Sequence, residues 1–157
     1  MMKTVVIVSQ DIVATNIADR TISPLHQTVI FRNIPSAIDF IYNSIPNLII
    51  IDISSSDKDA ASHIGTLKGD PMFSQLPILA ILEEPSQVAD VTNLFIEDFI
   101  WKRDLEKELS ARFNLAMLRS ERIVEINPLT RLPGNISINR QIEERLARKE
   151  TFAFAYA

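Results

Sequence analysis

The sequence lacks several features that would each define a class of protein. It contains no cysteine, which excludes disulfide bonds and thiolate metal sites. It has no basic segment followed by an apolar leader, and no apolar run is long enough to cross a bilayer. Internal repeats and low-complexity tracts are also missing. We therefore expect a cytoplasmic protein with no membrane partner.

Basic residues are scarce in the first two thirds of the chain. Residues 1–101 carry five Lys and Arg against twelve Asp and Glu, whereas residues 102–157 carry eleven against eight. The net charge of −4 therefore divides into −7 and +3. Nucleic-acid binding needs clustered Lys and Arg to neutralise phosphates, and Glu residues dilute the basic tail. We expect no nucleic-acid partner.

The chain does contain enough apolar residues to build one domain. Of its 157 residues, 46% are hydrophobic, which suffices for a core of ordinary size. Five short runs rich in apolar and β-branched residues are predicted to be strands, and they span residues 5–8, 26–31, 48–51, 76–82 and 98–101. The second run starts with polar residues, which is typical of a sheet edge. Segments with helical spacing lie between the runs, one after a predicted N-cap at Ser36 and another after Ser86.

This alternation of strand and helix predicts the fold class. We expect an α/β fold, a doubly wound five-stranded parallel sheet covered by helices on both faces, with a C-terminal helical extension. In such folds the functional site lies at the carboxyl ends of the strands. Candidate site residues are therefore those that directly follow the predicted strands.

The residues from Asp104 onward have the pattern of a long charged helix. Apolar or small residues recur there in steps of three and four, at Leu105, Leu109, Phe113, Ala116, Ser120 and Ile123. The first half of this helix either packs on its own sheet or contributes to a dimer contact. Residues past 112 are expected to lie beyond the sheet and to seek a partner helix. Asn127-Pro128 ends the helix, because proline disfavours a helical residue before it.

Residues at the ends of the predicted strands resemble those of response-regulator receiver domains. The segment 46–52 is similar to the phosphoacceptor strand of that family and puts Asp52 at the phosphorylated position. The segment 67–78 resembles the passage from the third helix to the fourth strand. The segment 98–102 resembles the fifth strand, with Lys102 at the position of the phosphate-contacting lysine. The resemblance implies a flavodoxin-like receiver fold and a role in two-component signalling or a phosphorelay.

Several positions depart from the receiver pattern. Receivers hold magnesium with two acidic residues after the first strand, together with the acceptor Asp, because a hard cation needs charged oxygen ligands. Those two positions are Ser9 and Gln10 here, and Asp11, one place later, would contribute only if the loop shifted. The hydroxyl position that ends the fourth strand is Leu82, and the switch aromatic is Phe99. We expect no cofactor, and magnesium only if the receiver is competent.

These departures favour a pseudo-receiver. Phosphoryl transfer depends on neutralising spreading negative charge, so losing the metal cage removes a major electrostatic contribution. We expect Asp52 and Lys102 to pair as a neutralised couple that holds the domain in one state. The alternative is a working receiver in which Asp11 supplies the missing carboxylate and a histidine kinase acts on Asp52.

A second resemblance lies in residues 127–157. The segment 127–135 resembles the opening motif of GGDEF domains, with Arg131 where a glycine is usual. In that family a metal-binding aspartate and a glycine-rich nucleotide signature come later, and the three glycines of this chain are not adjacent to one another. The resemblance implies a cyclic di-GMP signalling protein in which a diguanylate cyclase or phosphodiesterase active site would lie beyond residue 157. The chain itself is expected to have no catalytic residues and not to be an enzyme.

The two resemblances together predict the domain organisation. We expect a receiver-like domain at 1–113, a coupling helix at 114–126 and the truncated start of a GGDEF domain at 127–157. The expected partners are a second copy, bound through the last receiver helix and its extension, and a downstream output domain. A further alternative is that the domain serves purely for dimerisation or docking.

Overall fold

The computed structural model describes residues 2–53, 59–94 and 96–122, together with residues 140, 143, 144 and 147. The chain divides into two compact units, Met1–Ser120 and Glu121–Ala157. The described residues of the second unit beyond 122 are helical and exposed: Arg140, Glu143, Glu144 and Ala147. The GGDEF-like opening predicted at 127–135 lies outside the described residues.

The first unit is built on a five-stranded sheet. Its strands are β1 (Thr4–Val8), β2 (Gln27–Phe31), β3 (Leu48–Asp52), β4 (Ile78–Leu82) and β5 (Asp98–Trp101). The strand order is β2-β1-β3-β4-β5 and every pairing is parallel, so β2 forms an edge as predicted. Strand β4 begins directly after Pro77, because proline has no N–H to donate to the ladder. The predicted doubly wound parallel sheet is confirmed.

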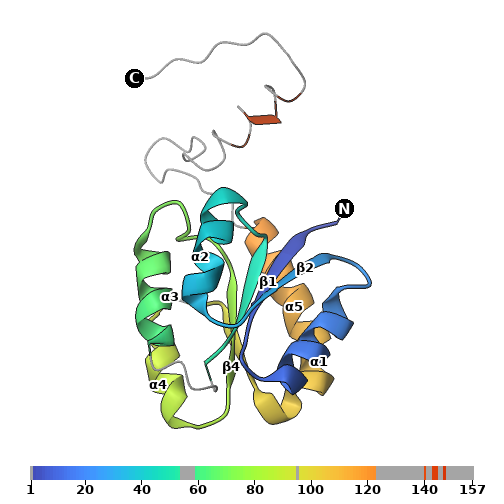
Figure 1. The fold of residues 1–157 in the computed structure, drawn as a ribbon, viewed down its shortest axis with the longest axis vertical. Helices are drawn as coiled ribbons and strands as arrows, with labels where there is room; N and C mark the ends of the chain where they lie inside the picture. The colour runs from blue at the N-terminus through green and yellow to red at the C-terminus, as the bar shows by residue number, and fades with distance from the viewer. Residues whose placement is uncertain are drawn as a thin grey trace. The chain divides into compact units, whose positions relative to one another are not determined.

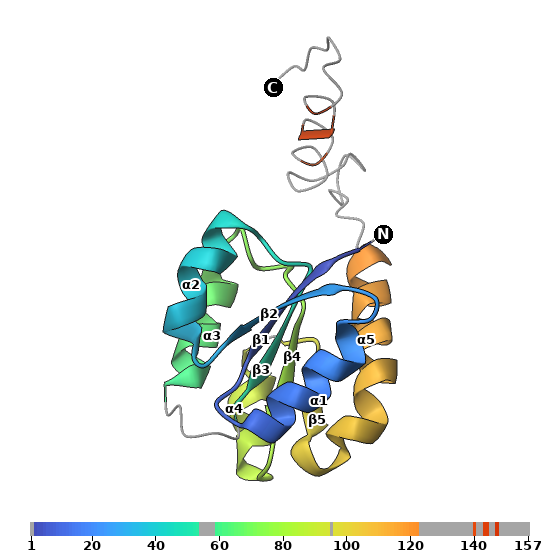
Figure 2. The same ribbon diagram turned by 45° about the vertical axis from the view of Figure 1, so that its right-hand side comes forward.

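Helices cover both faces of the sheet. They are α1 (Ile12–Ile22), α2 (Ile34–Asn43), α3 (Ala60–Gly69), α4 (Ser86–Thr92) and α5 (Leu105–Arg122), with a 3-10 turn η1 (Lys102–Asp104) before α5. Buried residues of α2, α3 and α4 pack on one face, and those of α1 and α5 pack on the other. Figures 1 and 2 show the two layers from two directions. Within the described residues, no helix combines the length and apolarity needed to span a membrane.

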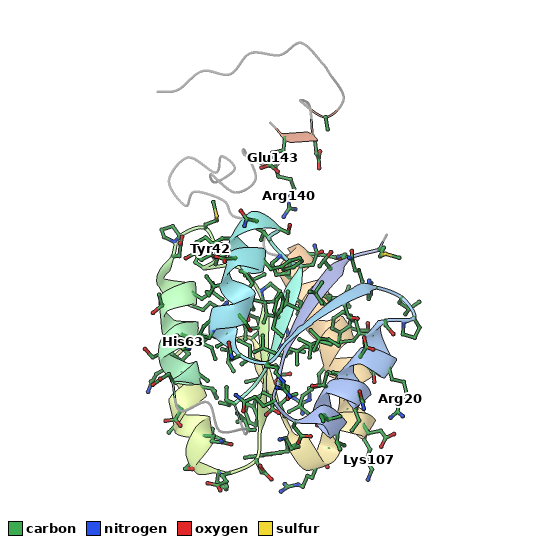
Figure 3. All side chains as sticks on the ribbon, viewed as in Figure 1. Arg20, Tyr42, His63, Lys107, Arg140 and Glu143 are labelled. Atoms are coloured by element: carbon green, nitrogen blue, oxygen red, sulfur yellow. The ribbon has the colours of Figure 1, made fainter. Side chains whose placement is uncertain are left out.

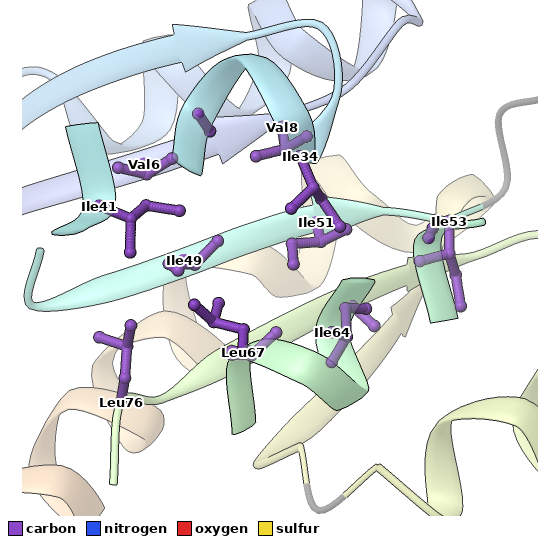
Figure 4. Packing of buried hydrophobic residues seen from close by; sticks show 14 of the residues in the cluster. Val6, Val8, Ile34, Ile41, Ile49, Ile51, Ile53, Ile64, Leu67 and Leu76 are labelled. Carbon is purple, nitrogen blue, oxygen red and sulfur yellow. The ribbon is translucent and has the colours of Figure 1, made fainter. Parts of the chain in front are cut away.

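Successive residues of the inner strands serve opposite faces. Val6 and Val8 belong to the core beneath α2 and α3, whereas Val5 and Ile7 belong to the core beneath α1 and α5. This alternation with apolar residues on both faces explains the continuous β-branched runs in the sequence. Side chains fill both layers (Figure 3), and Figure 4 shows those of α2 and α3 packed over β1 and β3. Fully burying one such aliphatic side chain contributes about 1.5–3 kcal/mol.

Helix α5 packs on its own sheet farther than predicted. The residues that it buries in the core shared with α1 are Leu105, Leu109, Phe113, Ala116 and Met117. The expectation that the sheet ends past residue 112 is therefore wrong. A helix rises 1.5 Å per residue, so about eleven residues are needed to cross a strand of roughly 17 Å, and the next turn still covers its flanking loop. Leu115 and Leu118 lie outside this contact, with exposed fractions of 48% and 45%.

Helix α2 begins earlier than the sequence indicated. Its N-cap is Asn33, whose Oδ1 accepts a hydrogen bond from the Ser36 N–H at 2.9 Å, so the predicted cap at Ser36 is wrong. Ser36 lies inside the first turn, and its Oγ donates to the Asn33 carbonyl at 2.9 Å. Pro35 fits this first turn because the N–H that it lacks would have no partner within the helix.

A buried ion pair fixes the amino ends of β4 and β5. The Lys68 ammonium of α3, with a side chain 5% exposed, lies 2.9 Å from Glu97 Oε1 and donates to the Leu76 carbonyl at 2.7 Å. Glu97 Oε2 in turn accepts the Ile78 N–H at 2.5 Å. This network ties α3 to the segments that enter both strands, at the end of the sheet opposite the predicted site.

Candidate functional site

Three strand ends and one helix start bring the candidate residues together. Asp52 is the last residue of β3, Ser9 directly follows β1, and Lys102 directly follows β5. Asp11 is the N-cap of α1. Because parallel strands end at the same edge, residues separated by up to 93 positions in the sequence meet in one cluster, which we call the Asp52 cluster (Ser9, Asp11, Asp52 and Lys102).

The carboxylate of Asp52 is buried, and its polar neighbours include Ser9 and Lys102. Its side chain has an exposed fraction of 0%. Ser9 Oγ donates a hydrogen bond to Asp52 Oδ2 at 2.7 Å, and Lys102 Nζ lies 3.3 Å from the same oxygen. A charge taken out of water needs a counter-charge and hydrogen bonds to be tolerated. The predicted pairing of Asp52 with Lys102 is confirmed.

Lys102 also contacts the second carboxylate of the cluster. Its Nζ lies 2.9 Å from Asp11 Oδ2, closer than it lies to Asp52. One ammonium therefore bridges two carboxylates, from the end of β3 and the start of α1. The side chain of Lys102 is 22% exposed, so the bridge sits at the rim of the sheet with one side toward solvent.

Asp11 reaches the cluster without any shift of the loop. Its Oδ1 accepts hydrogen bonds from the N–H groups of Val13 at 2.9 Å and Ala14 at 3.3 Å, which caps α1. Its Oδ2 is left for Lys102. Ser9 Oγ accepts the Asp11 N–H at 3.0 Å and so fixes the turn between β1 and α1. The helix cap therefore aims the Asp11 carboxylate at Lys102, and the expectation that Asp11 would hold magnesium only after a loop shift stays a prediction.

The bridge shifts the protonation equilibria of Lys102 and Asp11, which are both partly buried, toward the charged forms. The hydrogen bond from Lys102 holds the pKa of the Asp11 carboxyl below its ordinary value, despite the opposing effect of partial burial. Partial burial would lower the pKa of Lys102, but the hydrogen bond to Asp11 and the charge of Asp52 outweigh it and raise that pKa. Each group therefore stabilises the ionised form of the other.

The two predicted switch positions carry apolar side chains in the structure. Leu82, at the end of β4, is fully buried in the core beneath α2, α3 and α4. Phe99 on β5 is half-buried and packs edge-on against Trp101, with ring centroids 5.6 Å apart. Gln10 is exposed in the loop between β1 and α1.

Gln87 lies near the Asp52 cluster and was not predicted from the sequence. Gln87, in the first turn of α4, donates from Nε2 to the carbonyl of Ile53, the residue directly after Asp52, at 3.0 Å. Its Oε1 accepts from the N–H groups of Glu83 at 2.8 Å and Glu84 at 3.0 Å. A glutamine in a polar segment gives no periodic signal, so only the three-dimensional arrangement identifies it.

The residues present do not suit a magnesium ion while Lys102 holds its position. Such a hard cation needs several charged oxygens, and both carboxylates that face the cluster centre are already paired with the ammonium. Among the described residues, no group of three His, Cys, Asp or Glu side chains is arranged to hold a metal. The arrangement can neutralise a buried carboxylate, and it does so with a cation that belongs to the chain.

Comparisons with known proteins agree with the fold. No protein-family model and no curated protein match the chain. The signal receiver domain of a signal transduction histidine kinase from Syntrophus aciditrophicus is 23% identical and covers 81% of this chain and 98% of its own, with a TM-score of 0.67. A CheY-like response regulator receiver domain protein from Methanospirillum hungatei is 14% identical, over 77% of this chain and 98% of its own, with a TM-score of 0.68.

A third similar structure holds a metal. The Mn²⁺-bound form of the response regulator Rcp1 is 20% identical to this chain and covers 69% of it and 90% of its own length, with a TM-score of 0.61. The sequence identities of these three structures to this chain are too low to infer a shared function. The three structures do share one architecture. The first unit of this chain therefore has the fold of response-regulator receiver domains.

Proposed function

We propose that the chain is the regulatory domain of a signalling protein and that it works as a pseudo-receiver, without magnesium-dependent phosphorylation of Asp52. The observation that carries this proposal is the position of Lys102, whose ammonium lies between Asp11 and Asp52. A cation supplied by the chain already neutralises the carboxylate that a metal would otherwise neutralise.

The electrostatics of phosphoryl transfer support the proposal. Phosphoryl transfer to a carboxylate spreads negative charge, and a divalent cation held by Asp52 and Asp11 would supply the positive charge that neutralises it. At this site a metal would have to displace a bound ammonium, and the described side chains of the Asp52 cluster would then offer it two carboxylates and one hydroxyl. A phosphoryl group on Asp52 would also find Leu82, an apolar side chain, at the end of β4. Both features disfavour the acyl phosphate.

The proposed output of the domain is inferred from the sequence that follows α5. The GGDEF-like sequence at 127–135 supports a parent protein in cyclic di-GMP signalling, as a diguanylate cyclase or a GGDEF protein paired with a phosphodiesterase domain. Helix α5 leads toward that sequence and exposes Leu115 and Leu118. A second copy that covers these two side chains would transmit a change in α5 geometry to the output domain.

A second candidate function is a competent receiver with Asp52 as the phosphoacceptor. The observation in its favour is that Asp11 already directs a carboxylate oxygen into the Asp52 cluster. If magnesium displaced Lys102, Asp11 and Asp52 would both be available to it. A histidine kinase would then be the partner that supplies the phosphoryl group.

Phosphorylation and a phosphoryl mimic discriminate the two candidates. The chain is incubated with acetyl phosphate or beryllofluoride and magnesium, and the products are measured by intact mass and by ¹⁹F NMR. The pseudo-receiver predicts no adduct in the native chain or in the Asp52→Asn variant. Asp39→Asn, on the exposed side of α2, is the matched control. An adduct that is present in the native chain and in Asp39→Asn but lost in Asp52→Asn overturns the proposal.

A further inference from the structure

Helix α4 is anchored to the sheet by very little apolar surface. It spans seven residues, all of them described, and Val91 is its one buried residue. Its N-cap position is Pro85, and no side chain caps its first turn. Short helices gain most of their stability from tertiary contacts. Because α4 buries so little apolar surface, polar contacts at its first turn are especially important for holding it in position.

The side chain of Gln87 provides those polar contacts. Its amide oxygen accepts the N–H groups of Glu83 and Glu84, so it holds the loop that leads out of β4 against the first turn of α4. Its amide nitrogen donates to the Ile53 carbonyl, at the end of β3. The Ile53 N–H donates to the Ile81 carbonyl at 3.1 Å, so this carbonyl belongs to a residue that still extends the sheet.

The location of these bonds links α4 to the Asp52 cluster. Ile53 is the next residue after Asp52, so a displacement of the Asp52 backbone moves the carbonyl that Gln87 binds. The side chain at the end of β4 is Leu82, which is buried and has no hydroxyl for a polar link between the cluster and the loop. The Gln87 amide takes hydrogen bonds on both of its ends and is half-buried.

We propose that Gln87 is a positioning residue that couples the end of β3 to α4, so that the charge state of the Asp52 cluster sets the orientation of α4. The coupling rests on the proposed function in that it takes the chain to be a regulatory domain. It does not depend on phosphorylation, because the link runs through the backbone carbonyl of Ile53. Two variants test the donor and the acceptor of the Gln87 side chain separately. Gln87→Met removes both, and Gln87→Glu keeps the acceptor but loses the donor.

Amide exchange tests the local contacts in the full chain. In Gln87→Met the Glu83 and Glu84 amides lose their acceptor, and we expect them to exchange at least about fivefold faster. In Gln87→Glu the acceptor remains, so their exchange should stay near the native rate. Gln75→Met, at an exposed position before β4, is the matched control and should change neither amide. Equal exchange in Gln87→Met and the native chain overturns the proposal.

Transmission is tested by adding Asp52→Asn to each background and recording amide chemical shifts. In the native and Gln75→Met backgrounds, Asp52→Asn should shift the amides of α4 as well as those of β3. In the Gln87→Met and Gln87→Glu backgrounds the shifts in α4 should be lost and those in β3 retained. Shifts in α4 of equal size in all backgrounds, or none in the native chain, contradict the coupling. Neither result depends on the phosphoryl-mimic experiment, so each proposal can fail separately.

Discussion

The ammonium of Lys102 lies 3.3 Å from the buried carboxylate of Asp52, although β4 lies between β3, which ends at Asp52, and β5, which Lys102 follows. Lys102 reaches across the carboxyl edge of the sheet because it is the first residue after β5 and its four-carbon stem is long enough. The same ammonium holds Asp11 at 2.9 Å. One ammonium thus bridges two carboxylates of the Asp52 cluster, and most of the predictions below follow from that bridge.

Removing Lys102 should destabilise the fold strongly. In Lys102→Met the buried Asp52 carboxylate loses the ammonium that lies 3.3 Å from it, and breaking a buried pair on one side costs about 3–5 kcal/mol. The free energy of unfolding is measured by urea denaturation. Lys107→Met, on the exposed side of α5, is the matched control and should change it by less than about 0.5 kcal/mol.

The double variant gives a stricter form of this prediction. Lys102→Met combined with Asp52→Asn removes both charges, and its unfolding free energy should recover much of what Lys102→Met alone loses. Strict additivity of the two single effects would show that the residues do not interact, and would contradict the pairing.

The dependence of stability on pH should have two limbs. The pKa of Asp11 is lowered from 3.8, so its stabilising contribution is complete above that value and is lost as the pH falls through the lower pKa of the folded state. The pKa of Lys102 is raised from 10.5, so its contribution is complete below 10.5 and is lost as the pH rises through the higher folded pKa.

Asp11→Asn isolates the acid limb. We expect the unfolding free energy of this variant to fall less steeply than that of the native chain below about pH 4, with the native chain more stable near neutral pH. Urea denaturation between acid and alkaline pH measures both limbs. An acid limb of unchanged slope in Asp11→Asn would show that the Lys102–Asp11 contact does not form in solution.

Restoring carboxylates should open the cluster to a divalent cation. Ser9→Asp with Gln10→Asp adds two carboxylates directly after β1, and charged oxygens are the ligands that a hard cation needs. Calorimetry with Mn²⁺ should detect binding in this variant and none in the native chain. Equal binding by both chains would show that the native cluster already suffices for a metal.

The exposed leucines of α5 should carry the contact between copies. Leu115→Glu with Leu118→Glu places charge on a face that is exposed in the single chain, so the fold should persist while a dimer dissociates. Light scattering measures the mass in solution, and circular dichroism checks the fold. Leu25→Glu, at a position 73% exposed before β2, is the matched control and should leave the mass unchanged. A native chain that is monomeric at all concentrations contradicts the dimer.

The strands and the centre of the site could be predicted because their signals are local. Continuous β-branched runs indicate strands buried on both faces, and β5 has the bounds that the sequence indicated. Asp52 and Lys102 directly follow or end such runs, so a parallel sheet brings them to one edge. Their pairing then follows from opposite charge.

The errors came from features that depend on contacts distant in sequence. Asn33 and Ser36 are both good N-cap residues. Which of them caps α2 depends on where β2 ends and the chain turns into the helix. The burial of Phe113 and Met117 depends on the length of the sheet beneath α5. The sequence gives no sign of the role of Gln87, because its side chain bonds to backbone groups of other segments.

The central claim is that Lys102 closes the Asp52 cluster to a divalent cation, and paramagnetic broadening tests it most directly. Mn²⁺ is titrated into the full native chain while the amide resonances near Ser9, Asp11 and Asp52 are followed. The account predicts no saturable broadening at these amides in the native chain. In the folded fraction of the Lys102→Met variant, it predicts that saturable broadening appears at the same amides. Saturable broadening centred on Asp52 in the native chain would contradict it.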